Sequence, residues 1–226
     1  TPLELNQLLK YGFDPFKLEK TVDNNIPVEY ITGFAEFYNR DFKVNSNVLI
    51  PRIETEELID LGLDYIESRA NKYKKVTFAD VGCGSGALGI TFALELEQRL
   101  VAYSGYLLDV STDALDVAKF NLNKHLANRD LNCFINQKEP SEIMLEQRNL
   151  LEGFNVSLDI IFANLPYIPS SRIPSLQPSV RQFEPHLALD GGEDGLKYIK
   201  HNDFNFKNNS TLIERAYKIY ITIKNI

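Results

Sequence analysis

The sequence is poor in the residues from which disulfide frameworks and metal centres are built. It contains two cysteines, Cys83 and Cys133, and three histidines that stand far apart along the chain. Two cysteines make neither a disulfide framework nor a four-ligand metal site, and isolated histidines do not complete one. We therefore expect free, reduced thiols and no bound metal.

The sequence also lacks long apolar runs. No stretch approaches the roughly 18 apolar residues of a membrane-spanning helix, and the start of the chain, Thr1–Leu5, does not resemble a signal peptide. The counts of 12 glycines and 10 prolines exclude the collagen-like and low-complexity classes. These observations predict a cytoplasmic protein that does not bind membranes, and we expect it to be a monomer.

Basic residues are fewer than acidic ones. The formal charge of -7 argues against a protein that mainly neutralises nucleic-acid phosphates, so direct binding of nucleic acid is not expected. With 226 residues, of which 44% are hydrophobic, the chain is long enough to bury a sizeable core. It suits one large domain, or one domain with a short appendage.

Strand and helix patterns alternate along the chain, which is typical of an α/β fold with a doubly wound, mainly parallel sheet and helices on both faces. Ile59, Leu63 and Ile66 form an apolar stripe that predicts a first helix. Further helices are expected up to about Leu96 and over Ser111–Leu126. The expected strands are Val76–Val81, Gly105–Val110, Asn132–Asn136 and Leu158–Ala163, with a last one at Tyr217–Ile223.

A glycine-rich turn, Asp-Val-Gly-Cys-Gly-Ser-Gly, lies where the first of these strands meets its helix. Glycines let the backbone approach a ligand closely, and a helix N-terminus offers free N–H groups. The spacing of Gly82, Gly84 and Ala87 also fits a dinucleotide fingerprint, so a nicotinamide enzyme is an alternative. The acid at the strand end is placed to hold a cationic amino group. The expected cofactor contacts here are Asp80, Gly82, Cys83, Gly84, Ser85 and Gly86.

A second acid, Asp109, ends the next strand. An acid at this place accepts hydrogen bonds from both hydroxyls of a ribose, which either class of cofactor would need. Ligands of parallel sheets bind at the carboxyl ends of the strands. We expect the strand that carries Asp80 to be central and to lie beside the one that leads into Asn164.

That fourth strand continues into Asn164, Leu165, Pro166 and Tyr167. Together with the glycine turn, this segment resembles the class I methyltransferases that use S-adenosyl-L-methionine and methylate a planar nitrogen. The resemblance implies a Rossmann-like fold, S-adenosyl-L-methionine as the cofactor, and catalysis by these four residues, with Asn164 also beside the cofactor. Because an amide lone pair is delocalised, the Asn164 oxygen and the Leu165 carbonyl would accept hydrogen bonds from the NH2 group. The Tyr167 ring would stack on the planar group.

Three further blocks, Glu29–Tyr38, Val48–Leu58 and Phe183–Leu196, resemble the glutamine-N5 methyltransferases of peptide chain release factors. The resemblance implies that the chain methylates a glutamine side chain in the Gly-Gly-Gln loop of a release factor. It also implies an adenine contact at Asn149 or Leu150. The implied substrate pocket is lined by Phe34, Arg52, Glu54, Thr55 and the residues Asn164 to Tyr167.

The same resemblance divides the chain into three parts. Residues 1–28 correspond to a reduced form of the family's helical N-terminal domain. Residues 29–50 form a linker, with a β-hairpin expected over Glu36–Val44 and its turn near Asn39 to Asp41. Residues 51–226 form the domain that binds S-adenosylmethionine.

Departures from the family pattern keep two other functions open. Leu165 and Ile53 stand where the family has proline. The form Asn-Leu-Pro-Tyr is typical of ribosomal-RNA adenine-N6 dimethyltransferases, so adenine-N6 methylation of RNA or DNA is the second hypothesis. A subunit that binds S-adenosylmethionine without catalysis is the third, because both ends of the chain are shorter than in the family.

Overall fold

The computed structural model describes residues 2–14, 25–68, 75–126, 141–198 and 200. These residues fall into two compact units. The hairpin unit consists of Thr1–Pro51 and Leu165–Lys200, and the sheet unit contains Arg52–Asn164. Among the described residues, no helix combines the length and the apolar character that a membrane span requires.

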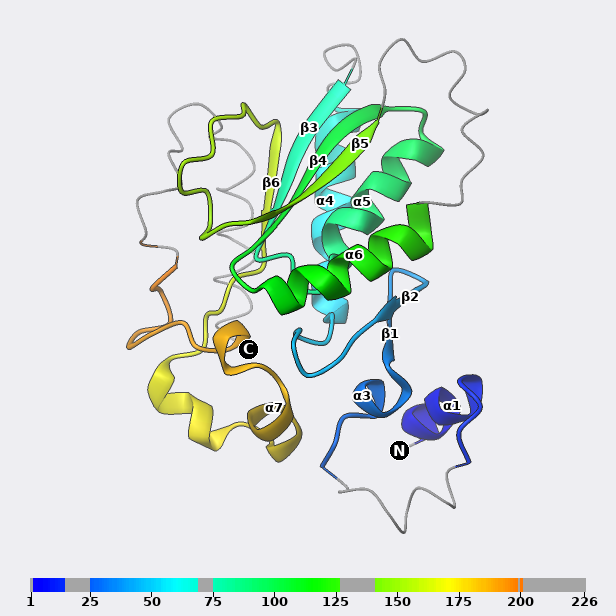
Figure 1. The fold of residues 1–226 in the computed structure, drawn as a ribbon, viewed down its shortest axis with the longest axis vertical. Helices are drawn as coiled ribbons and strands as arrows, with labels where there is room; N and C mark the ends of the chain where they lie inside the picture. Colours follow the sequence, from blue (N-terminus) through cyan, green and yellow to red (C-terminus); the bar gives the residue numbers. More distant parts are fainter. Residues whose placement is uncertain (1, 15–24, 69–74, 127–140, 199, 201–226) are drawn as a thin grey trace. The chain divides into compact units, whose positions relative to one another are not determined.

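The sheet unit is built on four parallel strands in the order β5-β4-β3-β6 (Figure 1). Their bounds are β3 Lys75–Val81, β4 Ala102–Asp109, β5 Glu142–Gln147 and β6 Ile160–Ala163. Asp80 of β3 is paired with Leu107 of β4 on one side and with Phe162 of β6 on the other. The predicted central position of the Asp80 strand, beside the strand that leads into Asn164, is therefore confirmed.

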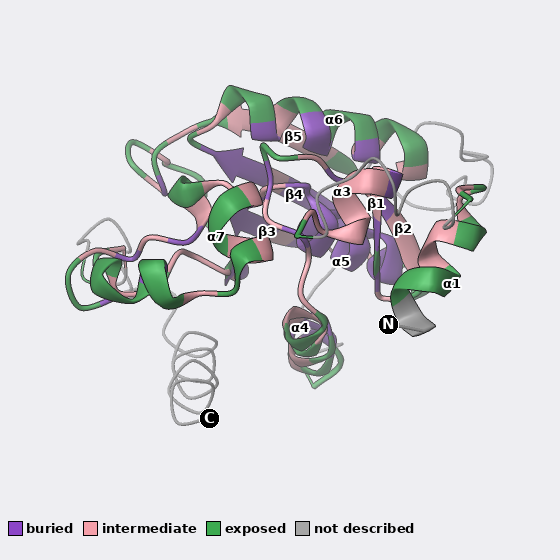
Figure 2. Cartoon of the chain, turned by 90° about the horizontal axis from the view of Figure 1, so that it is seen from below, coloured by how far each residue is buried: buried purple, intermediate pink, exposed green. Residues whose placement is uncertain are grey.

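The described residues of this unit form four helical elements: η1 Ile53–Glu56, α4 Glu57–Glu67, α5 Ala87–Gln98 and α6 Thr112–Leu126. The apolar stripe of α4 is buried at Ile59, Leu63 and Ile66, as the periodicity predicted. Figure 2 shows that α5 is largely buried, whereas buried and exposed positions alternate along α6. The buried face of α6 consists of Ala114, Val117, Ala118 and Asn121.

The core of the sheet unit is a cluster of three phenylalanine rings. Phe92 of α5 meets Phe78 of β3 edge-on, with ring centroids 5.1 Å apart, and Phe162 of β6 at 4.8 Å. Gly62 lets α4 approach this cluster, since a Cβ there would lie 2.9 Å from carbon atoms of both Phe92 and Phe162. Aromatic pairs in such edge-to-face contact stabilise a core beyond the area that they bury.

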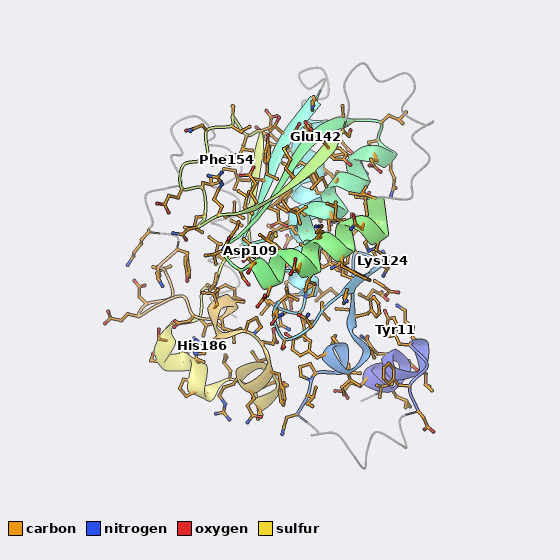
Figure 3. All side chains as sticks on the ribbon, viewed as in Figure 1. Tyr11, Asp109, Lys124, Glu142, Phe154 and His186 are labelled. Atoms are coloured by element: carbon orange, nitrogen blue, oxygen red, sulfur yellow. The ribbon has the colours of Figure 1, made fainter. Side chains whose placement is uncertain are left out.

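Within the sheet unit, the helices α4, α5 and α6 cover one face of the sheet, the face that carries Phe78, Leu107 and Phe162 (Figure 1). The opposite face carries Tyr106, whose ring packs edge-on against Phe154, with ring centroids 5.0 Å apart. Phe154 is labelled in Figure 3. The parallel sheet with helices is the predicted fold class. Helices on the second face, which the sequence also predicted, are not found among the described residues of the sheet unit.

The hairpin unit contains the predicted β-hairpin. Strand β1 Phe34–Phe37 pairs with β2 Arg40–Lys43 in antiparallel register. The turn consists of Tyr38 and Asn39, whose φ angles of 50° and 58° suit a tight two-residue hairpin turn. The turn therefore begins one residue earlier than the sequence indicated. Helices α1 Pro2–Lys10 and α3 Val28–Thr32 precede the hairpin.

The second segment of this unit begins at Leu165 and contains η3 Ser170–Ser175, α7 Pro178–Phe183 and η4 His186–Ala188. Buried Glu184 connects it with the first segment, because its Oε2 accepts a hydrogen bond from the Ile50 N–H at 3.4 Å. The segment ends in a loop in which Asp190 is paired with Ile168.

The strand predictions differ from the structure mainly at β5, and strand β4 begins at Ala102, three residues before the predicted start at Gly105. Strand β5 was not predicted, because Ile143, Met144 and Leu145 form a short apolar run between charged residues. Glu142 at its start forms a hydrogen bond with the Ser104 hydroxyl of β4 at 3.0 Å, and charged side chains are common on edge strands. The predicted strands Asn132–Asn136 and Tyr217–Ile223 lie outside the described residues.

Phe92→Ala should lower the free energy of unfolding by about 3–5 kcal/mol, because it leaves a cavity between the two neighbouring rings. Urea unfolding followed by circular dichroism measures this loss. Val156→Ala is the control, since that side chain is exposed, and it should change the value by less than about 0.5 kcal/mol. A loss under about 1 kcal/mol for Phe92→Ala would contradict the assignment of the core.

Candidate functional site

The glycine turn joins β3 to α5 and is held by backbone hydrogen bonds. The amides of Gly82 and Cys83 donate to the Leu108 carbonyl of β4 at 2.8 and 3.0 Å, and the Gly86 amide donates to the Cys83 carbonyl at 2.8 Å. Gly84 has a φ of 54°, and no atom of the described residues, its two chain neighbours aside, lies within 4 Å of the position that a Cβ would occupy. The turn thus presents its backbone to open space at Gly84.

Asp109, at the junction of β4 and α6 (Figure 3), is tied to the glycine turn. Its Oδ2 accepts a hydrogen bond from the Gly84 N–H at 2.8 Å, and its Oδ1 accepts one from the Ser111 N–H at 2.9 Å. A carboxylate oxygen can accept more than one hydrogen bond. The carboxylate can therefore orient the turn and still accept hydrogen bonds from a ligand.

Asp80 lies deeper than Asp109. Its Oδ2 accepts a hydrogen bond from the Gly89 N–H in the first turn of α5 at 2.8 Å. A Cβ at Gly89 would lie 2.4 Å from the Leu107 side chain and 2.9 Å from the Asp80 Cβ, so only glycine permits this approach. Burial is the main cause that raises the pKa of Asp80 to about 7; the Gly89 hydrogen bond acts in the opposite direction, and the negative charge of Asp109 contributes a smaller increase.

Cys83 and Ser85 are both buried residues of the glycine turn. Burial, followed by the charges of Asp80 and Asp109, raises the pKa of the Cys83 thiol well above its ordinary value, which keeps the thiol neutral. The Ser85 carbonyl accepts a hydrogen bond from the Asn121 amide of α6 at 2.9 Å.

Asn121 was not identified from the sequence as a residue of the site, although its position in the helix pattern indicates one. It is fully buried and follows Val117 and Ala118 at helical spacing, so it is a polar residue within an apolar stripe. A buried polar side chain needs a hydrogen-bond partner, and here the partner is the glycine turn.

Asn164 directly follows β6 and meets Thr55, which is 109 residues away in the sequence. The Asn164 Nδ2 donates a hydrogen bond to the Thr55 hydroxyl at 3.1 Å. Among the described residues, this is the one hydrogen bond of the Asn164 side chain. It occupies the amide nitrogen and leaves the Oδ1 carbonyl to accept a hydrogen bond. Thr55 and Glu54 both belong to the short helix η1, and Arg52 lies directly before this helix.

Asn149 and Leu150 follow the carboxyl end of β5, the edge strand beside β4. Leu150 is buried and has a φ of 52°. Asn149 is exposed, and its amide donates a hydrogen bond to Glu152 at 3.4 Å. Because the strands are parallel, these residues, Asp109, the glycine turn and Asn164 all lie at one edge of the sheet.

Leu165, Pro166, Tyr167 and Phe34 belong to the hairpin unit. Leu165 and Pro166 are half-buried, whereas the Tyr167 side chain is exposed. The Phe34 ring stacks on Tyr11, with ring centroids 5.2 Å apart and an angle of 13° between the ring planes. Among the described residues, no cluster of three or more His, Cys, Asp or Glu side chains is arranged to hold a metal ion.

Asp80→Asn should change how stability depends on pH. The pKa of Asp80 is about 7 in the folded protein and 3.8 as its ordinary value. Between these values the folded protein keeps a proton that the unfolded chain has released, so this contribution to stability falls as the pH rises. Asparagine retains an oxygen for the Gly89 N–H and carries no charge.

The Asp80→Asn variant should therefore gain roughly 2 kcal/mol in free energy of unfolding relative to the unsubstituted chain between about pH 5.5 and about pH 8. Urea unfolding of both proteins across this range measures the difference. Asp113→Asn, at an exposed acid in the first turn of α6, is the control and should leave the profile unchanged. Parallel profiles for Asp80→Asn and the unsubstituted chain would contradict the assignment.

The chain is similar in sequence to curated methyltransferases. The release factor glutamine methyltransferase of Bacillus cereus is 39% identical to the chain over 200 residues, which are 87% of this chain and 63% of that protein. The protein of the same name from Clostridium acetobutylicum is 38% identical over 201 residues, or 88% of this chain and 62% of that protein. The chain thus spans less than two thirds of the length of these curated relatives.

Among solved structures, magnesium protoporphyrin IX methyltransferase from Synechocystis with bound SAH aligns with a TM-score of 0.36 and 14% identity, over 67% of this chain and 74% of that one. The family model described as "Methyltransferase small domain" matches residues 55–170. This match covers just over half of the chain and includes the glycine turn, Asp109 and the segment after β6. The chain belongs to the methyltransferase small domain family.

Proposed function

We propose that the chain transfers a methyl group from S-adenosyl-L-methionine to the side-chain amide nitrogen of a glutamine in the Gly-Gly-Gln loop of a release factor. The observation that carries the proposal is the hydrogen bond from Asn164 to Thr55, which leaves the Asn164 carbonyl available at the carboxyl edge of the sheet. The names of the relatives support the same substrate and do not favour adenine methylation.

The residues of the sheet unit fit S-adenosylmethionine. Gly84 combines a positive φ with open space where a side chain would stand, so a ligand can approach the backbone there. The Asp109 carboxylate is oriented by two backbone amides and retains lone pairs for ribose hydroxyls. Asn149 and Leu150 lie beyond Asp109 along the same edge, where the adenine is expected. Asp80 supports the glycine turn indirectly, because its carboxylate accepts a hydrogen bond from the Gly89 N–H in the first turn of α5.

In this proposal the cofactor, when bound, supplies an electrophilic methyl group, and the chain prepares the nitrogen that attacks it. The Asn164 Oδ1 and the Leu165 carbonyl accept hydrogen bonds from the two N–H groups of the substrate amide, which directs the nitrogen lone pair toward the methyl group. Thr55 fixes which end of the Asn164 amide faces the substrate. Acceptors oriented before the reaction need no rearrangement during it, and this lowers the barrier.

Asp109→Ala should weaken the binding of S-adenosylmethionine by roughly 1.5–3 kcal/mol, because it removes hydrogen bonds to a charged acceptor. Isothermal titration calorimetry with S-adenosylmethionine and with its demethylated product measures the loss. Asp113→Ala, which removes an exposed acid four residues away, is the matched control and should bind the cofactor normally. Unchanged affinity in Asp109→Ala, or binding of NAD instead, would contradict the cofactor assignment.

Asn164→Ala should lower the turnover number by about 10²–10³, since it removes one oriented polar contact with the reacting group. The affinity for S-adenosylmethionine should change by less than about tenfold, because the glycine turn and Asp109 remain. Single-turnover assays and calorimetry separate the two effects. Asn123→Ala, at an exposed asparagine of α6, is the control. A variant that methylates release factor as fast as the unsubstituted chain would rule out this mechanism.

The substrate is tested by incubating the protein with radiolabelled S-adenosylmethionine and either a release factor or ribosomal RNA. We expect the label on the release factor. Replacing the glutamine of its Gly-Gly-Gln loop by alanine should abolish the incorporation of label. Label on the RNA alone would favour adenine methylation. Binding of the cofactor without label on either substrate would favour a non-catalytic subunit.

A further inference from the structure

The loop from Asp190 to Leu196 closes around the backbone of Tyr167. A Cβ on Gly195 would lie 2.3 Å from the Tyr167 carbonyl oxygen, and a Cβ on Gly191 would lie 2.8 Å from the Tyr167 Cα. Both distances are shorter than any real Cβ contact, and the obstructing atoms belong to the backbone. Both glycines are buried. The loop and Tyr167 can take these positions only if neither glycine carries a side chain.

Hydrogen bonds hold the loop and the residues after Tyr167 together. The Ile168 amide donates to the Leu189 carbonyl at 3.1 Å, and the Gly191 amide donates to the Ile168 carbonyl at 2.9 Å. The Ser170 hydroxyl donates to the Asp190 carboxylate at 2.6 Å. The Ser170 amide also donates to the Gly192 carbonyl at 2.9 Å, so four hydrogen bonds fix the backbone on the C-terminal side of Tyr167 in addition to the two glycine contacts.

The Tyr167 ring contrasts with this backbone. The residue is 42% exposed, although its backbone is enclosed. Because the allowed side-chain rotamers depend on the backbone angles, a fixed backbone restricts where an exposed ring can point. An exposed aromatic ring on a fixed backbone is suited to stacking on a planar group from outside the chain.

We propose that Gly191 and Gly195 are positioning residues, which hold the Tyr167 ring in place for stacking on the planar amide of the protein substrate. This inference rests on the proposed function. It assigns a task to the glycine-rich loop that is separate from cofactor binding, because the glycine turn and Asp109 belong to the sheet unit. Loss of either glycine contact should therefore affect methyl transfer to the protein substrate and leave the cofactor in place.

Gly195→Ala should lower the turnover number with release factor by about 10²-fold, the effect of displacing a positioned group by about 1 Å. The dissociation constant of S-adenosylmethionine should stay within about twofold. Gly192→Ala is the matched control. Gly192 has a similar φ of 83°, but its Cβ would meet the Lys197 side chain instead of Tyr167. The turnover number of the Gly192→Ala variant should therefore stay within about threefold of that of the unsubstituted chain.

Gly191→Ala is the second variant, in case Gly195→Ala does not fold. Gly191 is not among the residues with positive φ, so this substitution introduces no strained backbone angle. Its Cβ would press on the Tyr167 Cα at 2.8 Å and on the Gly195 backbone at 2.9 Å. Equal turnover in Gly192→Ala, Gly191→Ala and Gly195→Ala would overturn the proposal. Absence of release factor methylation by the unsubstituted chain would instead overturn the proposed function.

A readout that does not depend on activity is available because the chain has no tryptophan. Tyr167→Trp introduces a single tryptophan at this position, and its fluorescence can be excited separately from that of the tyrosines. Its fluorescence anisotropy should fall when Gly195→Ala or Gly191→Ala is added, and should not change with Gly192→Ala. Equal anisotropy in all of these proteins would show that the glycines do not hold the ring, whatever the substrate of the enzyme is.

Discussion

Strand β3 is enclosed on both edges, and the rest of the sheet unit depends on this constraint. A buried backbone amide or carbonyl without a partner destabilises the fold, so β3 needs a hydrogen-bonded neighbour on each side. Strands β4 and β6 provide them, in parallel register. Because parallel strands end at the same edge, the pairing brings the glycine turn, Asp109 and Asn164 to one edge of the sheet.

The same edge shows how acidic side chains stabilise a glycine-rich backbone. Asp80 and Asp109 each accept a hydrogen bond from a glycine amide, one inside the first turn of α5 and one within the turn itself. Asn121 adds a third contact from α6. Glycine loses more conformational entropy on folding than other residues, and these hydrogen bonds offset part of that loss. A turn held in this way can remain open to a ligand at Gly84.

Much of this arrangement could be predicted from local patterns. The apolar stripe of α4, the strand before the glycine turn and the β-hairpin are each encoded within a few residues, and all three are present. Strand β5 was missed, since its three apolar residues lie between glutamates and its stability comes from pairing with β4. The helix that contains Asn121 was expected, but the reason for its buried amide was not, because that reason lies 36 residues away in the glycine turn.

The sequence by itself determined the class of fold and the residue types of the candidate site, because periodicity, glycine spacing and the Asn-Leu-Pro-Tyr segment are local properties of the chain. The tertiary structure decided how those residues are used. It pairs Asn164 with Thr55, joins Asp109 to Gly84, and buries Asp80 so that its pKa rises. It also encloses the Tyr167 backbone with Gly191 and Gly195. Such contacts join residues that are distant in sequence, and their geometry depends on how the elements pack, which no local pattern encodes.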